Sequence, residues 1–152
     1  GSGQFPTELE DATGEKLREA GMEFGATTGR PRRCGWLDLP QLKYAVMING
    51  VTQLCMMKAD VLGEFDEVQV CTHYIHNGEK IDYLPYGINP DEVQPVYETF
   101  EGWPGDLTGL RKKENIPASL MSYVKMIEDV VGVKVSILSV GPDREQTLLL
   151  NP

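Results

Sequence analysis

Residues 67 to 84 read Glu67-Val-Gln-Val-Cys-Thr-His-Tyr-Ile-His-Asn-Gly-Glu-Lys-Ile-Asp-Tyr-Leu84. In the first part of this stretch, side chains favoured in β-strands take every second position, as in a strand with one face on a core. These side chains are Val68, Val70, Thr72 and Tyr74. Asn77-Gly78 follows, a dipeptide that suits a two-residue hairpin turn with positive φ at both residues. The stretch therefore predicts an antiparallel β-hairpin.

Before the hairpin the sequence predicts two helices and one strand. Residues 14–20 contain good helix formers, and Gly21 suits a left-handed position after the last turn. Asp38 can cap a second helix over residues 39–49, with one face made by Leu42, Ala45, Val46 and Asn49. The apolar run 53–57 is too short for three helical turns, so it predicts a buried strand.

After the hairpin, one strand is predicted at residues 96–100 in a segment rich in Pro, Gly and charge. A helix that ends at Gly132 has one apolar face made by Leu120, Tyr123, Val124, Ile127 and Val131. Residues 133–137 are rich in β-branched side chains and predict a further strand. The hairpin and the helix-to-strand passages predict an α/β fold with a mixed or antiparallel sheet and two to three principal helices. The length fits one domain, residues 1–152.

Composition narrows the classes of partner. Lys and Arg number 14 against 23 Asp and Glu, and the resulting net charge of −9 opposes binding to nucleic acid or to an anionic membrane. No apolar run is long enough to span a membrane. The chain has 3 cysteines and no Cys-x-x-Cys pair, so neither a disulfide framework nor a zinc site is indicated, and a cytoplasmic location is expected.

One basic stretch interrupts this acidic chain, Gly25-Ala-Thr-Thr-Gly-Arg-Pro-Arg-Arg33. Its glycines allow consecutive backbone N–H groups to converge on an anion, and two threonines add hydroxyl groups. Arginine binds carboxylate or phosphate through two parallel hydrogen bonds, and the stretch supplies Arg30, Arg32 and Arg33. The stretch predicts a pocket for a small anion, with a solvated basic loop as the structural alternative.

Lys58-Ala59-Asp60 follows the predicted strand at residues 53–57. A carboxylate at Asp60 could accept both the N1–H and the N2–H of guanine, while the Lys58 stem covers the ring. Adenine has an acceptor at N1 and no amino group at position 2, so it would leave a desolvated aspartate unpaired. An exposed charged turn is the structural alternative.

Five blocks resemble adenylosuccinate synthetases, in the order and approximate spacing of that family. The blocks are Phe5-Pro-Thr-Glu-Leu9, Glu23-Phe-Gly-Ala-Thr-Thr-Gly-Arg-Pro-Arg-Arg-Cys-Gly-Trp-Leu-Asp38, Lys58-Ala-Asp-Val-Leu62, Tyr97-Glu-Thr-Phe-Glu-Gly-Trp103 and Gly141-Pro-Asp-Arg144. The resemblance is to the carboxyl-terminal portion of the family's longer chain. It leaves two origins open for Gly1-Ser2-Gly3, a native glycine-rich stretch or a residual tag.

The resemblance implies a GTP-dependent ligase that joins L-aspartate to IMP, giving adenylosuccinate, GDP and phosphate in AMP synthesis. It implies that L-aspartate is held by Ala26, Thr27, Thr28, Gly29, Arg30, Pro31 and Arg32. Arg30 would also reach IMP, and Arg32 would lie near the GTP phosphates. The guanine base would be held by Lys58, Ala59, Asp60, Ser139, Val140 and Gly141. Many family members have Arg and Thr at the positions of Pro31 and Val140, so at Val140 a backbone contact is expected and a hydroxyl contact is not.

The sequence has no Gly-x-x-x-x-Gly-Lys-[Ser/Thr] loop for a triphosphate. In the resembled family, the general base, the assisting histidine and the Mg²⁺-binding phosphate loop lie in the amino-terminal part, so we expect no catalytic or metal-binding residue here. The chain alone should be inactive, and the whole enzyme is expected to be a homodimer. The alternative is a stand-alone, non-catalytic domain that binds a purine nucleotide or assembles with a partner.

Other polar and aromatic residues carry structural expectations. His73 and His76 lie three apart on a predicted strand, so they should point to opposite faces and not share a metal ion. The acidic series Glu15, Glu19 and Glu23 should form a solvated edge. Packing roles are expected for Cys34, Cys55, Cys71, Trp36 and Trp103.

Overall fold

The computed structural model describes residues 3–89 and 92–150, and the chain divides into two compact units. The first unit comprises residues 1–44 and 69–99, and the second comprises residues 45–68 and 100–152. Gly1 and Ser2, whose origin the sequence leaves open, lie outside the described residues. The assignment of residues 1–152 to one carboxyl-terminal domain stays a prediction.

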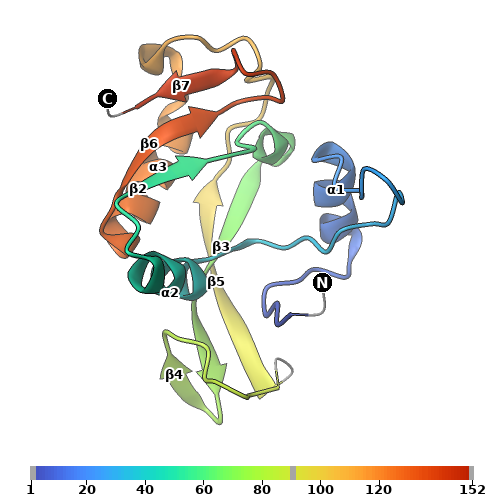
Figure 1. The fold of residues 1–152 in the computed structure, drawn as a ribbon, viewed down its shortest axis with the longest axis vertical. Coiled ribbons are helices and arrows are strands. Elements are labelled where there is room, and N and C mark those ends of the chain that lie inside the picture. Colours follow the sequence, from blue (N-terminus) through green and yellow to red (C-terminus); the bar gives the residue numbers. More distant parts are fainter. Residues whose placement is uncertain (1–2, 90–91, 151–152) are drawn as a thin grey trace. The chain divides into compact units, whose positions relative to one another are not determined.

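The first unit contains a helix and most of a four-stranded sheet (Figure 1). Its elements are α1 (Ala12–Ala20), β1 (Leu37–Asp38), β3 (Glu67–His76), β4 (Glu79–Ile81) and β5 (Val93–Glu101), the two long strands continuing into the second unit. Strand β3 pairs in parallel with β1, antiparallel with β4, and also with β5. Asn77 and Gly78 have φ of 51° and 80° between β3 and β4. The predicted hairpin is therefore confirmed.

Helix α1 begins at a capping side chain and ends differently from the prediction. The Asp11 carboxylate accepts hydrogen bonds from the N–H groups of Thr13 and Gly14, at 3.0 and 3.1 Å. Gly21 follows the last turn in right-handed conformation, with φ −82°. The left-handed position falls instead on Met22, with φ 50°. The prediction of a left-handed Gly21 is wrong because the chain turns one residue later.

The second unit contains a three-stranded sheet and a long helix (Figure 1). The chain enters it within α2 (Leu39–Asn49) and continues through β2 (Gln53–Met56), η1 (Val61–Glu64), η3 (Lys113–Asn115), α3 (Ala118–Val131), β6 (Lys134–Ser139) and β7 (Thr147–Leu149). Strand β6 lies between β2, its parallel partner, and β7, its antiparallel partner. Parallel and antiparallel pairs, with three α-helices among the described residues, confirm the predicted α/β fold class.

Helix α3 contributes a buried apolar face to the second unit. All five residues of its predicted apolar face are buried, and Gly132 ends the helix with φ 76°, as predicted. The rings of Trp103 and Tyr123 pack edge to face with centroids 5.1 Å apart. Trp103 is 2% exposed and Trp36 is 8% exposed, so both packing predictions are confirmed.

Strand β2 is less buried than the sequence predicts. Its side chains alternate between exposed and half-buried, because the strand is at the edge of its sheet and, among the described strands, pairs with β6 alone. Cys55 is consequently exposed, and its predicted packing role is wrong. Cys71 is fully buried, and burial raises the pKa of its thiol to about 12, as expected of a packing residue.

Candidate functional site

The arginine loop, residues 25–33, is closed by its own backbone hydrogen bonds within the first unit. The Gly25 N–H donates to the Arg30 carbonyl and the Gly29 N–H donates to the Gly25 carbonyl, both at 2.8 Å. Gly29 has φ +64°, a conformation that favours glycine. Both glycine amides are therefore used inside the loop and are not available to an anion.

The tip of the arginine loop keeps three adjacent donors open. Ala26, Thr27 and Thr28 are exposed, and their backbone N–H groups have no acceptor among the described residues. The Thr28 hydroxyl oxygen accepts a hydrogen bond from the Arg30 N–H at 3.3 Å, which holds this side chain against the loop. Adjacent free amides of this kind can bind an anion.

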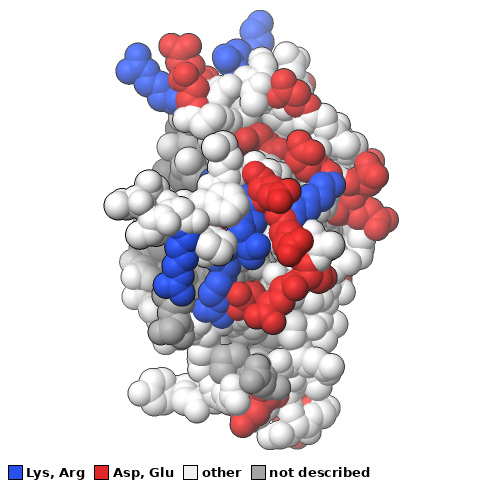
Figure 2. Space-filling model, turned by 90° about the vertical axis from the view of Figure 1, so that its right-hand side faces the viewer, with Lys and Arg blue, Asp and Glu red and all other residues white. Residues whose placement is uncertain are grey.

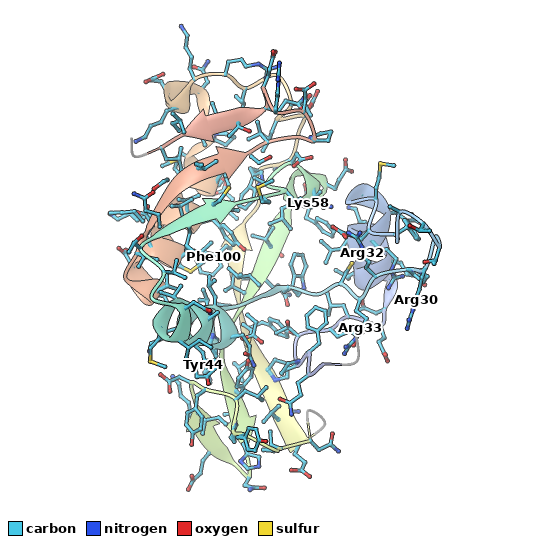
Figure 3. All side chains as sticks on the ribbon, in the orientation of Figure 1. Arg30, Arg32, Arg33, Tyr44, Lys58 and Phe100 are labelled. Atoms are coloured by element: carbon cyan, nitrogen blue, oxygen red, sulfur yellow. The ribbon has the colours of Figure 1, made fainter. Side chains whose placement is uncertain are left out.

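The three arginines have different partners (Figure 3). The Arg30 guanidinium is exposed and has no hydrogen-bond or ion-pair partner in the described part of the chain. Arg32 Nη1 lies 2.9 Å from Glu23 Oε2, so Glu23 is not part of a merely solvated edge. Arg33 pairs with Glu8 instead. Figure 2 shows a face of the molecule on which basic and acidic side chains lie next to one another. Arg30 is therefore the loop arginine most available to a ligand.

A pocket of about 540 Å³ lies beside the arginine loop. Residues 3–5 line one part of it, and the loop contributes Gly25, Thr28, Arg30, Pro31, Arg32 and Arg33. The volume lies in the usual range for sites of small organic ligands. As far as the structure describes the first unit, it combines a pocket, amides without an acceptor and a guanidinium without a partner, which together suit a small carboxylate or phosphate.

In the second unit, the backbone of Ala59 is held on both sides. The Ala59 N–H donates to the Ser139 carbonyl at 3.3 Å, and the Ala59 carbonyl accepts from Trp103 Nε1 at 2.8 Å. Lys58, just before it, has φ 60°, a left-handed conformation that is strained for a residue with a Cβ. The half-buried Asp60 carboxylate follows and has no hydrogen-bond partner within the described ranges. An unpaired, partly desolvated carboxylate is suited to accepting donors from a ligand.

The segment Ser139–Gly141 is buried and lies against the Lys58–Asp60 segment through the bond from Ala59. The Ser139 hydroxyl donates to the Gly141 carbonyl at 3.0 Å, and the Val140 N–H donates to the Gln146 carbonyl at 2.8 Å. Any backbone contact from Val140 to a ligand must therefore come from its carbonyl oxygen. A Cβ at position 141 would overlap the end of the Gln146 side chain, so a larger residue here would require that side chain to move.

Five residues that line or support the two candidate sites were not predicted from the sequence to be part of them. Arg32 and Arg33 are paired with acidic residues, and the guanine segment is fixed by the Trp103 indole and by the chain near Gln146. The residues missed are Phe5, Glu8, Glu23, Trp103 and Gln146. Phe5, Glu8, Glu23 and Trp103 lie inside the blocks that carry the family resemblance, which was the available signal for them.

The described residues contain no cluster of three or more His, Cys, Asp or Glu suited to a metal ion. His73 contacts the Thr72 hydroxyl, whereas His76 contacts Asn77, so the two histidines have different neighbours. Within the described ranges, no helix combines the length and the apolar character needed to cross a bilayer.

Comparison with known proteins gives one family. The adenylosuccinate synthetase family model matches residues 1–148. The adenylosuccinate synthetases of Cytophaga hutchinsonii and Flavobacterium johnsoniae are 55% and 54% identical over 150 and 148 residues, which is 98% and 97% of this chain and 35% of each relative. A solved structure of fully ligated adenylosuccinate synthetase from Plasmodium falciparum matches with a TM-score of 0.90 at 35% identity, covering 99% of this chain and 37% of that one.

An α/β fold with an arginine-lined pocket, and a carboxylate that has no partner among the described residues, defines a candidate ligand-binding part of an enzyme. The chain belongs to the adenylosuccinate synthetase family. It spans about a third of the length of the curated relatives it matches.

Proposed function

We propose that this chain supplies the guanine-reading and aspartate-binding parts of a GTP-dependent ligase that joins L-aspartate to IMP. The observation that carries the proposal is the Asp60 carboxylate, half-buried and without a partner among the described residues, beside the buried Ser139–Gly141 segment. Guanine offers two adjacent donors that match the two oxygens of one carboxylate. The Gly141 N–H has no acceptor in the described part of the chain, so it can donate to the guanine carbonyl oxygen.

The arginine loop would hold the L-aspartate carboxylates. Thr28 and Arg30 line the pocket, and the adjacent amides of Ala26 and Thr27, like that of Thr28, have no acceptor among the described residues. These amides and the Arg30 guanidinium would supply the donors, and Arg30 would also reach IMP. Arg32 would lie near the GTP phosphates, which requires it to exchange or share its contact with Glu23. Gly29 and Pro31 would shape the loop rather than contribute side-chain donors.

The triphosphate and its Mg²⁺ would be held by a part of the enzyme outside these residues. No phosphate-loop motif is present in the sequence, and no metal cluster occurs within the described residues. We therefore propose that residues 1–152 act as the carboxyl-terminal domain of a cytoplasmic, homodimeric synthetase. By themselves these residues should lack ligase activity.

Two measurements test the proposal. The complete synthetase chain that contains residues 1–152 should form adenylosuccinate from IMP, L-aspartate and GTP, whereas residues 1–152 purified free of host enzyme should form none. Arg30→Ala in the complete chain should raise the KM for L-aspartate by about tenfold or more, since a charge-assisted contact is lost. The alternative is a stand-alone nucleotide-binding domain. It would be favoured if residues 1–152 bind GDP and the chain also occurs without any amino-terminal part.

A further inference from the structure

Arg33 is the most constrained arginine of the loop. Its Nε and Nη2 atoms lie 2.6 and 2.5 Å from Glu8 Oε2, and its Nη1 donates to the Gly3 carbonyl at 2.8 Å. The guanidinium carbon also lies 5.3 Å from the centre of the Phe5 ring, in cation–π range. Each nitrogen of the guanidinium is therefore engaged within the chain, and the hydrogen bond that Arg33 donates to Glu8 raises the Arg33 pKa.

The contacts of Arg33 join the arginine loop to the amino-terminal segment that lines the same pocket. Gly3, Gln4 and Phe5 line this pocket together with the loop. Backbone contacts continue the junction, because the Leu9 N–H donates to the Cys34 carbonyl at 2.9 Å and Glu8 forms a β-bridge with Gly35. One side of the pocket is thus attached to the other through Arg33 and Glu8.

We infer that Arg33, Glu8 and Phe5 form a brace that positions the wall of the anion pocket, and that Arg33 is a positioning residue and not a ligand-binding one. Glu8 neutralises the Arg33 charge, which leaves Arg30 as the loop arginine that reads the anion. Arg32 differs from Arg33 because its side chain is 57% exposed and, among the described residues, it forms an ion pair with Glu23, at 2.9 Å. The identity of the anion, L-aspartate, rests on the proposed function. The brace itself does not depend on it.

The substitution Glu8→Gln distinguishes a bracing Arg33 from an Arg33 that contacts the ligand, because the two cases predict opposite changes in the KM for L-aspartate. If Arg33 touched the ligand, removing the competing Glu8 charge would free the guanidinium and lower the KM for L-aspartate. If Arg33 braces the wall, Glu8→Gln should raise this KM in the same direction as Arg33→Ala, by about threefold to tenfold, with a smaller change in kcat. The double variant should be no worse than the more affected single variant.

Amide hydrogen exchange in residues 1–152 supplies a readout that does not depend on ligase activity. Arg33→Ala and Glu8→Gln should raise the exchange rate of the Leu9 amide by about tenfold, and Arg33→Lys should raise it less because one charged contact survives. The matched control is Arg111→Ala, which removes an exposed arginine of the second unit.

Two results would overturn the brace: a lower aspartate KM in Glu8→Gln, or wild-type exchange at Leu9 in both Glu8→Gln and Arg33→Ala. Because Glu8→Gln and Arg33→Lys are close in size to the native residues, they keep the test available if Arg33→Ala does not fold. If the wild-type synthetase does not use L-aspartate, the proposed function is refuted. The hydrogen-exchange result then still tests the brace by itself.

Discussion

The Tyr74 hydroxyl lies 2.7 and 2.6 Å from the two carboxylate oxygens of Asp38, and so links the residue before α2 to the carboxyl-terminal part of β3. Tyr74 is fully buried and Asp38 is half-buried. Tyr74→Phe removes this donor while keeping the ring, and should lower the free energy of unfolding by about 1.5–3 kcal/mol, the value of a hydrogen bond to a charged group. Urea unfolding measures the change. Tyr86→Phe, at a fully exposed tyrosine, is the control and should have little effect.

The same carboxylate should make stability depend on pH. Burial raises the pKa of Asp38, against the opposing effects of its hydrogen bonds from Tyr74 and Gln41. The folded protein then keeps this proton at a pH where the unfolded chain has lost it, so the stability contributed by Asp38 falls as pH rises from the ordinary Asp value through the raised one. Asp38→Asn should lose less stability than wild type between about pH 4 and about pH 7. An equal loss in both proteins, measured by urea unfolding, would contradict the assignment.

Gly35→Ala should destabilise the junction between the amino-terminal segment and the arginine loop. A Cβ at this position would overlap the Thr7 carbonyl oxygen, which is backbone and cannot move aside as a side chain can. We expect a loss of about 1–3 kcal/mol, the usual cost of overpacking. Gly109→Ala is the matched control, because a Cβ there meets nothing within 4 Å. Thermal unfolding of the two variants should differ clearly, and equal midpoints would show that the junction is looser than the structure indicates.

Asp60→Asn tests the guanine assignment in the complete synthetase. The amide offers one acceptor and one donor, so it cannot accept both guanine protons, and apparent GTP binding should weaken by about 2–4 kcal/mol. Xanthine has a carbonyl where guanine has its amino group, so the variant should gain in the ratio of kcat/KM for XTP over that for GTP. The KM values for IMP and L-aspartate should change much less. Asp129→Asn, at an exposed position of α3, is the control. An unchanged ratio together with a wild-type GTP KM means that Asp60 does not read the base.

Local signals predicted most of the elements. The period of apolar residues placed the apolar face of α3, and Asn77-Gly78 placed the turn between β3 and β4. The predicted cap of α2 is also confirmed, since Asp38 Oδ1 accepts the Gln41 N–H at 3.1 Å. Strand β7 (Thr147–Leu149) was not predicted. It is only three residues long, and its pairing with β6 is a tertiary contact that no local pattern indicates. The prediction that β2 is buried was wrong because burial also depends on tertiary contacts. Apolar composition does not distinguish an edge strand from a central one.

For the candidate site, the sequence predicted residue types but not their pairing. Arg30, Arg32 and Arg33 look alike in the sequence, and only the fold shows that Glu23 and Glu8 pair with two of them. Glu8 and Arg33 are too far apart in the sequence for the periodicity of one helix or strand to predict their contact. The contact between Ala59 and Ser139 is equally non-local, although the resemblance had assigned both segments to one base.

The bond between Ala59 and Ser139 joins two segments that are far apart in the chain, one after β2 and one at the end of β6. A nucleotide that contacts both segments, as proposed, would act as a non-covalent cross-link that exists only in the folded protein. By mass action, stability would then rise with the logarithm of guanine nucleotide concentration once that concentration exceeds the dissociation constant. The abundance of this protein in a cell would thereby respond to the supply of the nucleotide that we propose it binds.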